Sequence, residues 1–141
     1  MSDCLFCKIL TGEIPATFVQ RQERCSAFLD IRPVNRGHLL IIPQEHAAGL
    51  ADLHPEAGAA MFQMAQHLAG ALRNSGLPCE AVNLYLADGA VAGQEVFHIH
   101  LHVVPRFEGD GFGLKFGPNY GRQPDPDEMT ETAGYIMNYP G

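Results

Sequence analysis

Three histidines that alternate with aliphatic residues constrain the fold more than any other stretch of this sequence. Residues 97–105 read FHIHLHVVP, which places His98, His100 and His102 at every second position. Alternation with a period of two, rich in β-branched residues, predicts a half-buried strand whose successive side chains point to opposite faces. We therefore expect the histidines on one face of a sheet and the aliphatic residues against a core. Pro105 lacks an N–H for the ladder and is predicted to end the strand.

These three histidines are also the main candidates for chemistry. Each imidazole has two ring nitrogens that need partners, so three on one sheet face are unfavourable as structure alone. Near neutral pH an imidazole can be a nucleophile, a general acid or base, or a metal ligand. The spacing leaves these roles open, and it also leaves open a solvated sheet face on which the histidines have no role.

The composition favours one folded domain that is not built to bind nucleic acid. The chain has 141 residues, of which 46% are hydrophobic and 18% charged, and its formal net charge is −7. This length suits a single domain over residues 1–141, and this hydrophobic content favours folding over disorder. An acidic balance argues against non-specific nucleic-acid binding, which needs a basic face. A small phosphate ligand stays compatible, because a site is local whereas net charge is global.

The expected location follows from the apolar runs. The first residues show no basic region followed by a long apolar run, so no signal peptide is predicted. The longest apolar run, residues 39–43, is too short to span a bilayer, and no membrane partner is expected. A cytoplasmic protein is the default expectation. In that compartment, four cysteines favour thiols or metal ligands over disulfides.

Five short strands and one long helix are expected along the chain. The predicted strands are residues 17–22, 25–30, 38–43, 80–87 and 97–105. Apolar residues at three- and four-residue steps predict a helix over residues 56–73, with a buried face of Phe62, Ala65, Ala69 and Leu72. A helical turn is expected near Ile9, and a short last helix over residues 128–138 with Asp127 as its cap.

Two other segments carry weaker signals. Cys4 and Cys7 form a single C-x-x-C pair, which is typical of metal or redox sites. Zinc would need two more ligands from elsewhere, and two packed thiols without metal remain an alternative. Residues 88–95 form a loop of small residues just before the histidines, where glycines let backbone amides approach an anion.

Taken together, these segments resemble the histidine triad (HIT) family, and within it the Hint-like branch of purine nucleoside phosphoramidases and nucleotide hydrolases. Residues 98–104 match the family signature of three histidines separated by hydrophobic residues. Residues 4–9, 13–15, 28–31, 37–43 and 93–94 follow the family in order and spacing. The resemblance implies an α+β, HIT-like fold, in which a five-stranded antiparallel sheet carries one long helix and a short C-terminal helix. It also implies a homodimer.

The chemistry that the resemblance implies is nucleotidyl transfer to water. His100 would attack the α-phosphate of a purine nucleotide, and water would then release the mononucleotide from a covalent nucleotidyl-histidine. His102 would contact the phosphate or manage protons, and His38 would support the site from behind. Asp30 would bind the ribose hydroxyls. The implied nucleotide site comprises Phe6, Ile9, Phe28, Asp30, Ile31, Gly93, Gln94, Glu95, His100 and His102.

The resemblance further implies a structural zinc ion. Some relatives bind zinc through two cysteines, a downstream histidine and the first histidine of the triad. The matching residues here are Cys4, Cys7, His46 and His98. These ligand types suit tetrahedral zinc with no open position, so the metal would contribute to folding rather than to chemistry.

Two departures from the family pattern leave alternatives open. Ala87 and Asp88 stand where many relatives have asparagine, and Glu95 stands where some have serine. A carboxylate near phosphate repels it unless it is protonated, paired or turned away, or it helps to protonate an amine leaving group. One alternative is therefore a dinucleoside polyphosphate hydrolase or phosphorylase that uses the same His100. Others are a non-catalytic, zinc-stabilised nucleotide-binding or interaction module, and a thiol-redox role for Cys4 and Cys7.

Overall fold

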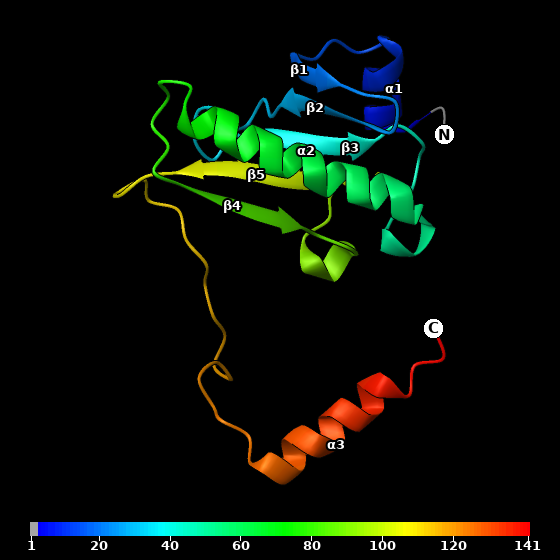
Figure 1. The fold of residues 1–141 in the computed structure, drawn as a ribbon, viewed down its shortest axis with the longest axis vertical. Coiled ribbons are helices and arrows are strands. Elements are labelled where there is room, and N and C mark those ends of the chain that lie inside the picture. The colour runs from blue at the N-terminus through cyan, green and yellow to red at the C-terminus, as the bar shows by residue number, and fades with distance from the viewer. Residues whose placement is uncertain (1–2) are drawn as a thin grey trace. The chain divides into compact units, whose positions relative to one another are not determined.

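A five-stranded antiparallel sheet with the strand order β1-β2-β3-β5-β4 is the frame of the protein (Figure 1). The computed structural model describes residues 3–141. The strands are β1 (Phe18–Arg21), β2 (Cys25–Leu29), β3 (Leu39–Pro43), β4 (Ala81–Leu86) and β5 (Leu101–Arg106). The predicted α+β fold with a five-stranded antiparallel sheet is confirmed. Four of the predicted strands agree with the observed ones to within one residue at each end, and the exception is β5.

The histidine segment enters the sheet later than predicted. β5 begins at Leu101, so His98 and His100 precede the strand and only His102 lies in it. The Ile99 N–H donates to the carbonyl of Ala47 at 2.7 Å rather than to a neighbouring strand. His98, Ile99 and His100 are all buried. The alternation therefore does not divide a polar from an apolar face here, because protein packs on both sides of this segment.

Pro105 does not end the strand as predicted. β5 continues to Arg106, and Pro105 pairs in register with Val82 of β4. On its other side, the last β3 partner is Leu39, which pairs with Val103. Pro105 thus lies beyond the β3 ladder, where a missing N–H is tolerated.

Helix α2 (Pro55–Arg73) covers one face of the sheet (Figure 1). The His54 ring caps its start by accepting the Glu56 N–H at 3.2 Å. Its buried side chains are Ala57, Met61, Met64, Ala65, Leu68 and Leu72. They pack on a core that includes Cys25, Ala27, Leu39, Ile41 and Val103.

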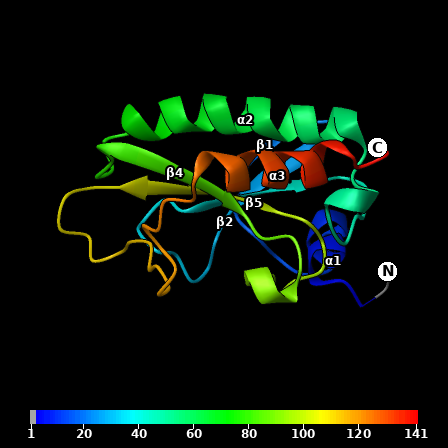
Figure 2. The same ribbon diagram turned by 90° about the horizontal axis from the view of Figure 1, so that it is seen from below.

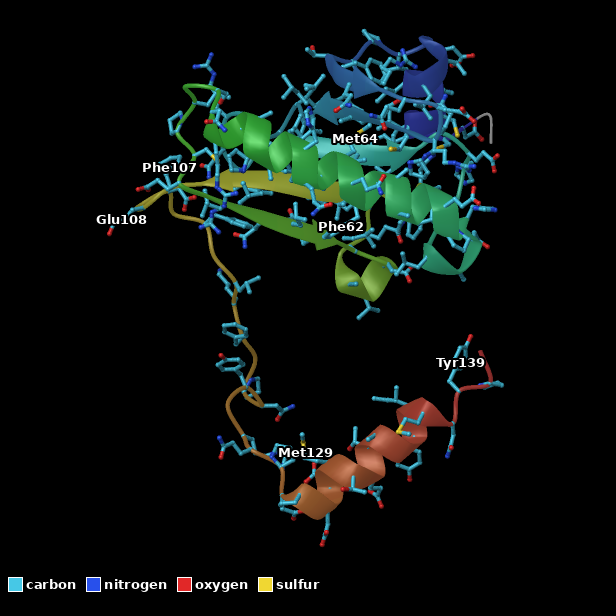
Figure 3. The ribbon with its side chains drawn as sticks, in the orientation of Figure 1. Phe62, Met64, Phe107, Glu108, Met129 and Tyr139 are labelled. Carbon is cyan, nitrogen blue, oxygen red and sulfur yellow. The ribbon has the colours of Figure 1, made fainter. Side chains whose placement is uncertain are left out.

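The predicted buried face of α2 is wrong at Phe62. That side chain is 54% exposed, and its neighbour Met61 is buried in its place. Figure 3 shows Phe62 and Met64 leaving α2 on different sides. Neighbouring helix positions differ by about 100° around the axis, and apolar residues at both 61 and 62 make the two faces hard to separate from sequence.

A second core lies on the opposite face of the sheet. Helix α1 (Leu5–Thr11) is on this side, away from α2 (Figure 2). It ends at Gly12, whose φ of +86° in the left-handed region favours glycine. The buried residues of this core are Phe6, Ile9, Leu10, Phe28, Leu40 and Ile42. Consecutive residues of β2 and β3 therefore serve two different cores, as the strand period requires.

The remaining segments include two short 3-10 helices, η1 (Leu50–Asp52) and η2 (Ala90–Ala92). The chain divides into two compact units, Met1–Gly111 and Phe112–Gly141. The prediction that residues 1–141 form a single domain stays a prediction. Across residues 3–141, none of the helices combines the length and apolar character needed to cross a membrane.

The second unit contains helix α3 (Pro126–Met137), the predicted short C-terminal helix. Its cap is Asp125, which accepts the Glu128 N–H at 2.9 Å, and not Asp127 as predicted. Pro126 occupies the first turn, where its fixed φ suits a helix and its missing N–H leaves no partner unsatisfied. Within α3 as the structure describes it, no side chain is buried.

Candidate active site and metal centre

His100 presents one ring nitrogen in a fixed chemical form. Its Nδ1 lies 2.9 Å from the backbone carbonyl oxygen of His98. Because a carbonyl can only accept, Nδ1 carries the proton and Nε2 keeps its lone pair in the neutral ring. The side of the ring is held by Phe6, whose centroid is 5.1 Å away in an edge-to-face contact. A neutral imidazole with a fixed tautomer can act as a nucleophile through Nε2.

A row of hydrogen bonds fixes the other two histidines of the site. The Val34 N–H donates to Nδ1 of His38 at 3.0 Å. A backbone N–H can only donate, so the neutral His38 ring carries its proton on Nε2. That Nε2–H donates to Nδ1 of His102 at 2.9 Å. His102 must then carry its own proton on Nε2, where it can donate to an acceptor such as a phosphate oxygen.

Burial keeps this row uncharged. Desolvation and the nearby His100 and His38 lower the pKa of His102 from 6.5 to about 4, although Asp30 opposes the shift. Burial also lowers the pKa of His38, again against the carboxylate of Asp30, whose Oδ2 lies 3.7 Å from His38 Nε2. Both rings are therefore neutral at pH 7, which is the state that the hydrogen-bonded row requires.

The free energy of unfolding is expected to fall as the pH drops from about 7 to about 4. The pKa values of His38 and His102 are lower in the folded chain than the unfolded value of 6.5. The unfolded chain therefore binds more protons in this window, and stability present above pH 6.5 is lost as the pH approaches the folded pKa. For His102 alone the loss at pH 5 is about 2 kcal/mol.

Urea denaturation of zinc-free protein at pH 7 and pH 5 measures this effect. Zinc-free protein is used because acid also releases metal from cysteine ligands. The His102→Asn variant should lose less stability over the same range. An equal loss in wild type and His102→Asn would show that His102 is not responsible.

The predicted base-binding residues divide into two groups. Phe6, Ile9 and Phe28 are buried together beside His100, with the Phe6 and Phe28 rings 5.5 Å apart. Ile31 is 92% exposed and lies outside this cluster. The structure thus brings three of the four apolar residues to the site.

The loop before the histidines is braced by Gln94. The two N–H donors of its amide bind the carbonyls of Ala48 at 2.6 Å and Val96 at 3.1 Å. Its Oε1 accepts the Gly89 N–H at 2.8 Å. Gly93 has a φ of +97°, which favours glycine. Both side-chain donors of Gln94 are used within the protein. The backbone N–H groups of Gly93 and Gln94 also donate within the loop, to the carbonyls of Ala90 at 3.0 Å and Gly89 at 3.1 Å.

The residues that depart from the family pattern have identifiable positions. Asp88 accepts the Leu50 N–H at 3.2 Å and so ties the loop to η1. Glu95 is exposed. Neither carboxylate is buried beside the ring of His100.

Tyr85, an aromatic residue at the site, was not predicted from the sequence. The ring of Tyr85 stacks on His102 with centroids 4.2 Å apart and planes inclined by 14°. Tyr85 in β4 pairs with His102 in β5, so the two share one face of the sheet. The alternation within β4 was visible in the sequence, but the register that places Tyr85 opposite His102 was not.

Four side chains converge in a second cluster that could hold a metal. The ligand atoms of Cys4, Cys7, His46 and His98 all lie within 4.8 Å of one another. Nδ1 of His98 is 3.4 Å from Cys4 Sγ and 3.6 Å from Cys7 Sγ, and Nδ1 of His46 is 3.5 Å from Cys7 Sγ. In tetrahedral zinc sites the usual bond lengths place sulfur and nitrogen ligands about 3.6 Å apart. The four residues therefore fit a zinc ion.

The orientation of His98 supports the same conclusion. Its Nε2 lies 2.9 Å from the carbonyl oxygen of Pro43. The carbonyl accepts, so Nε2 carries the proton and Nδ1 directs a lone pair toward the two sulfurs. Such a second hydrogen bond orients metal-ligating histidines and sets their tautomer.

A third cluster also consists of residue types that bind metals, but one of its histidines carries a proton on the nitrogen that would have to bind the metal. Ligand atoms of Asp30, His38 and His102 also lie within 4.8 Å of one another. However, the Val34 N–H donates to His38 Nδ1, so Nε2 of His38 carries a proton and cannot bind a metal. This cluster serves as a hydrogen-bonded row instead.

We therefore expect one zinc ion per chain. Elemental analysis of purified protein should give a stoichiometry near one. Of the two possible ligand clusters within residues 3–141, the histidine nitrogens of Asp30–His38–His102 are engaged in hydrogen bonds with each other, whereas Cys4–Cys7–His46–His98 fits a metal. His46→Ala should lower the zinc content, whereas His38→Ala should leave it unchanged. A content of two per chain, reduced to one by His38→Ala, would contradict the assignment of the third cluster.

Comparisons with known proteins agree with this geometry. Residues 11–109 match the HIT domain family. An uncharacterized HIT-like protein of Borreliella burgdorferi is 44% identical over 119 residues, which cover 83% of this chain and 85% of that protein. The adenylylsulfatase HINT3 of Arabidopsis thaliana is 38% identical over 109 residues, 77% of this chain and 55% of that protein. The crystal structure of a Zn-bound histidine triad family protein from Mycobacterium smegmatis is 44% identical, with a TM-score of 0.77 over 84% of this chain and 85% of that one.

The matched region contains the sheet, α2 and all three histidines of the 98–102 segment. It covers more than half of the chain, and the relatives match over most of their own length in two of the three cases. The chain therefore belongs to the HIT family.

Proposed function

We propose that this protein is a purine nucleoside 5′-phosphoramidase that works through a covalent nucleotidyl-His100 intermediate. The observation that carries the proposal is the fixed tautomer of His100, whose Nδ1–H donates to the His98 carbonyl and leaves Nε2 as the nucleophile. The sequence relatives support a nucleotide substrate, since one of them is an adenylylsulfatase and therefore acts at an adenylyl group.

The first displacement forms a P–N bond to His100. Nε2 attacks the α-phosphorus, the bond from phosphorus to the leaving nitrogen breaks, and that nitrogen takes a proton from solvent and departs as the neutral amine. His100 becomes a positively charged, nucleotidylated imidazole in which Nδ1 still carries its proton. The His98 carbonyl 2.9 Å away accepts from Nδ1 and stabilises this charge without any movement of the chain.

The second displacement regenerates the free enzyme from the nucleotidyl-His100 intermediate. Water attacks the phosphorus and gives up a proton to solvent, the P–Nε2 bond breaks with its electron pair returning to Nε2, and the mononucleotide leaves. In both steps the Nε2–H of His102 donates to a phosphoryl oxygen on which negative charge builds. His38 holds His102 in the tautomer that can do this. Dividing one difficult substitution into two easier ones is the benefit of the covalent route.

The rest of the site binds and orients the nucleotide. In this proposal Asp30 accepts hydrogen bonds from the ribose hydroxyls, and the cluster of Phe6, Ile9 and Phe28 lies against the base. The loop of Gly93, Gln94 and Glu95 borders the phosphate, and its internal hydrogen bonds keep the loop in one conformation. A zinc ion at the four-residue cluster would contribute stability, and the protein would act as a homodimer.

The proposal is tested by comparing leaving groups on one nucleotide. Release of AMP should be fastest from adenosine 5′-phosphoramidate and slower from diadenosine tetraphosphate and adenylyl sulfate. A preference for the dinucleotide would favour a dinucleoside polyphosphate hydrolase. A preference for adenylyl sulfate would indicate an adenylylsulfatase with the same nucleophile. Nucleotide binding without turnover of any of the three would reduce the site to a binding module.

A further inference from the structure

Tyr85 has no part in the mechanism above, yet it touches one of its histidines. β4 and β5 lie side by side (Figure 1). Tyr85 stands directly opposite His102 in their register. The two rings stack with centroids 4.2 Å apart and an inclination of 14°. Tyr85 remains 39% exposed, so one face of its ring covers His102 while the rest of the side chain meets solvent.

The other contacts of His102 leave its orientation incompletely defined. Nδ1 accepts from His38 at 2.9 Å, which fixes one point of the ring. The His100 ring lies 5.0 Å away and is inclined by 58°, and the His38 ring is inclined by 51°. A single hydrogen bond lets an imidazole tilt about the bonded atom. A parallel ring against its face removes that freedom, since tilting would break the stack.

We propose that Tyr85 is a positioning residue that holds the His102 ring in the plane from which Nε2–H reaches the phosphoryl oxygen. This inference rests on the proposed function, because it takes His102 to contact the phosphate. The aromatic ring carries the effect, and the hydroxyl group does not.

The electrostatics of His102 provide an independent readout of the stack. His100, His38 and Asp30 are the titratable groups that face this ring together with Tyr85. Burial is the largest cause of its lowered pKa. Removing the tyrosine ring admits water to one face of the imidazole and should move the titration of His102 back toward the ordinary value.

The test compares Tyr85→Phe with Tyr85→Leu. Leu84→Ala is the matched control, because Leu84 is the preceding residue of the same edge strand, is 36% exposed, and pairs with Val103 on the other face of the sheet. Imidazole NMR of ligand-free protein follows the titration of His102 in each variant. Steady-state kinetics with adenosine 5′-phosphoramidate give kcat and KM separately.

Tyr85→Leu should raise the titration midpoint of His102 by about one pH unit and lower kcat by roughly tenfold to a hundredfold, with KM changed much less. Tyr85→Phe should match wild type in both measurements, as should Leu84→Ala. An unchanged His102 titration and kcat in Tyr85→Leu would overturn the proposal, and so would equal defects in Tyr85→Leu and Tyr85→Phe. If wild type proves inactive, the NMR shift still tests the positioning of His102 separately from the proposed reaction.

Discussion

Replacing His100 by alanine is expected to lower the release of AMP from adenosine 5′-phosphoramidate by about 10⁴-fold or more. The variant loses the only atom proposed to form the covalent bond, and His102 cannot replace it, because its Nδ1 is occupied by His38 and its Nε2 carries the proton. Binding of AMP should persist, since the proposed ribose and base contacts are on other residues.

Two measurements check this expectation. Steady-state turnover gives the size of the loss, and intact-protein mass spectrometry of a reaction quenched under non-acidic conditions detects the nucleotidyl adduct. His67→Ala is the matched control, because it removes a solvent-exposed histidine on α2 outside the site. Turnover of His100→Ala within tenfold of wild type would exclude His100 as the nucleophile. An adduct that persists in the variant would assign the bond to another residue.

Loss of the metal centre is expected to cost about 3 kcal/mol of stability, or roughly 10 °C in the melting temperature. Cys4 and Cys7 belong to the N-terminal α1 segment, whereas His46 follows β3 and His98 precedes β5. A zinc ion bound at this cluster would join these three segments, and the unfolded chain has no preformed site for it. The effect should be smaller than in a zinc finger, because the α2 core remains intact without metal.

Activity should fall with the metal as well. His98 offers Nδ1 to the cluster, and its carbonyl oxygen accepts the Nδ1–H of His100. Phe6, which lies between the two cysteines, packs against the rings of His98 and His100. Releasing the cysteines therefore loosens the contacts that hold the nucleophile.

The melting temperatures of wild type, of chelator-treated protein and of Cys7→Ser measure the stability that the metal contributes. Cys79→Ser is the control. Cys79 is a partly buried cysteine whose thiol donates a hydrogen bond to the Ala81 carbonyl, and it is remote from the cluster in sequence. We expect Cys7→Ser to melt well below Cys79→Ser and to match chelated wild type. Equal melting temperatures for the two serine variants would show that the metal centre does not stabilise the fold.

Much of the sheet could be predicted because local patterns determine it. The continuous apolar run of β3 and the alternation in β4 are properties of a few adjacent residues. The start of β5 could not be predicted in this way. Ile99 donates to Ala47 instead of a strand, and this depends on a chain segment some fifty residues away.

In the candidate site, too, some features follow from the local sequence and others depend on distant parts of the chain. The alternating histidines at positions 98, 100 and 102 are visible in the sequence, and the resemblance to relatives supplied His38, His46 and Asp30. Tyr85 and the internal bonds of Gln94 were missed, because each depends on strand register or on a loop conformation. Side-chain type reveals a candidate residue, whereas its partners are set by tertiary packing.

The hydrogen bond from Val34 to His38 has a consequence for how this site tolerates mutation. The donor is a main-chain amide, which nineteen of the twenty amino acids supply equally well. The protonation of His38 and His102 therefore does not depend on which side chain is present at position 34. The side chain at position 34 can therefore vary while the chemistry persists, and proline, which lacks the amide hydrogen, is the one residue excluded there.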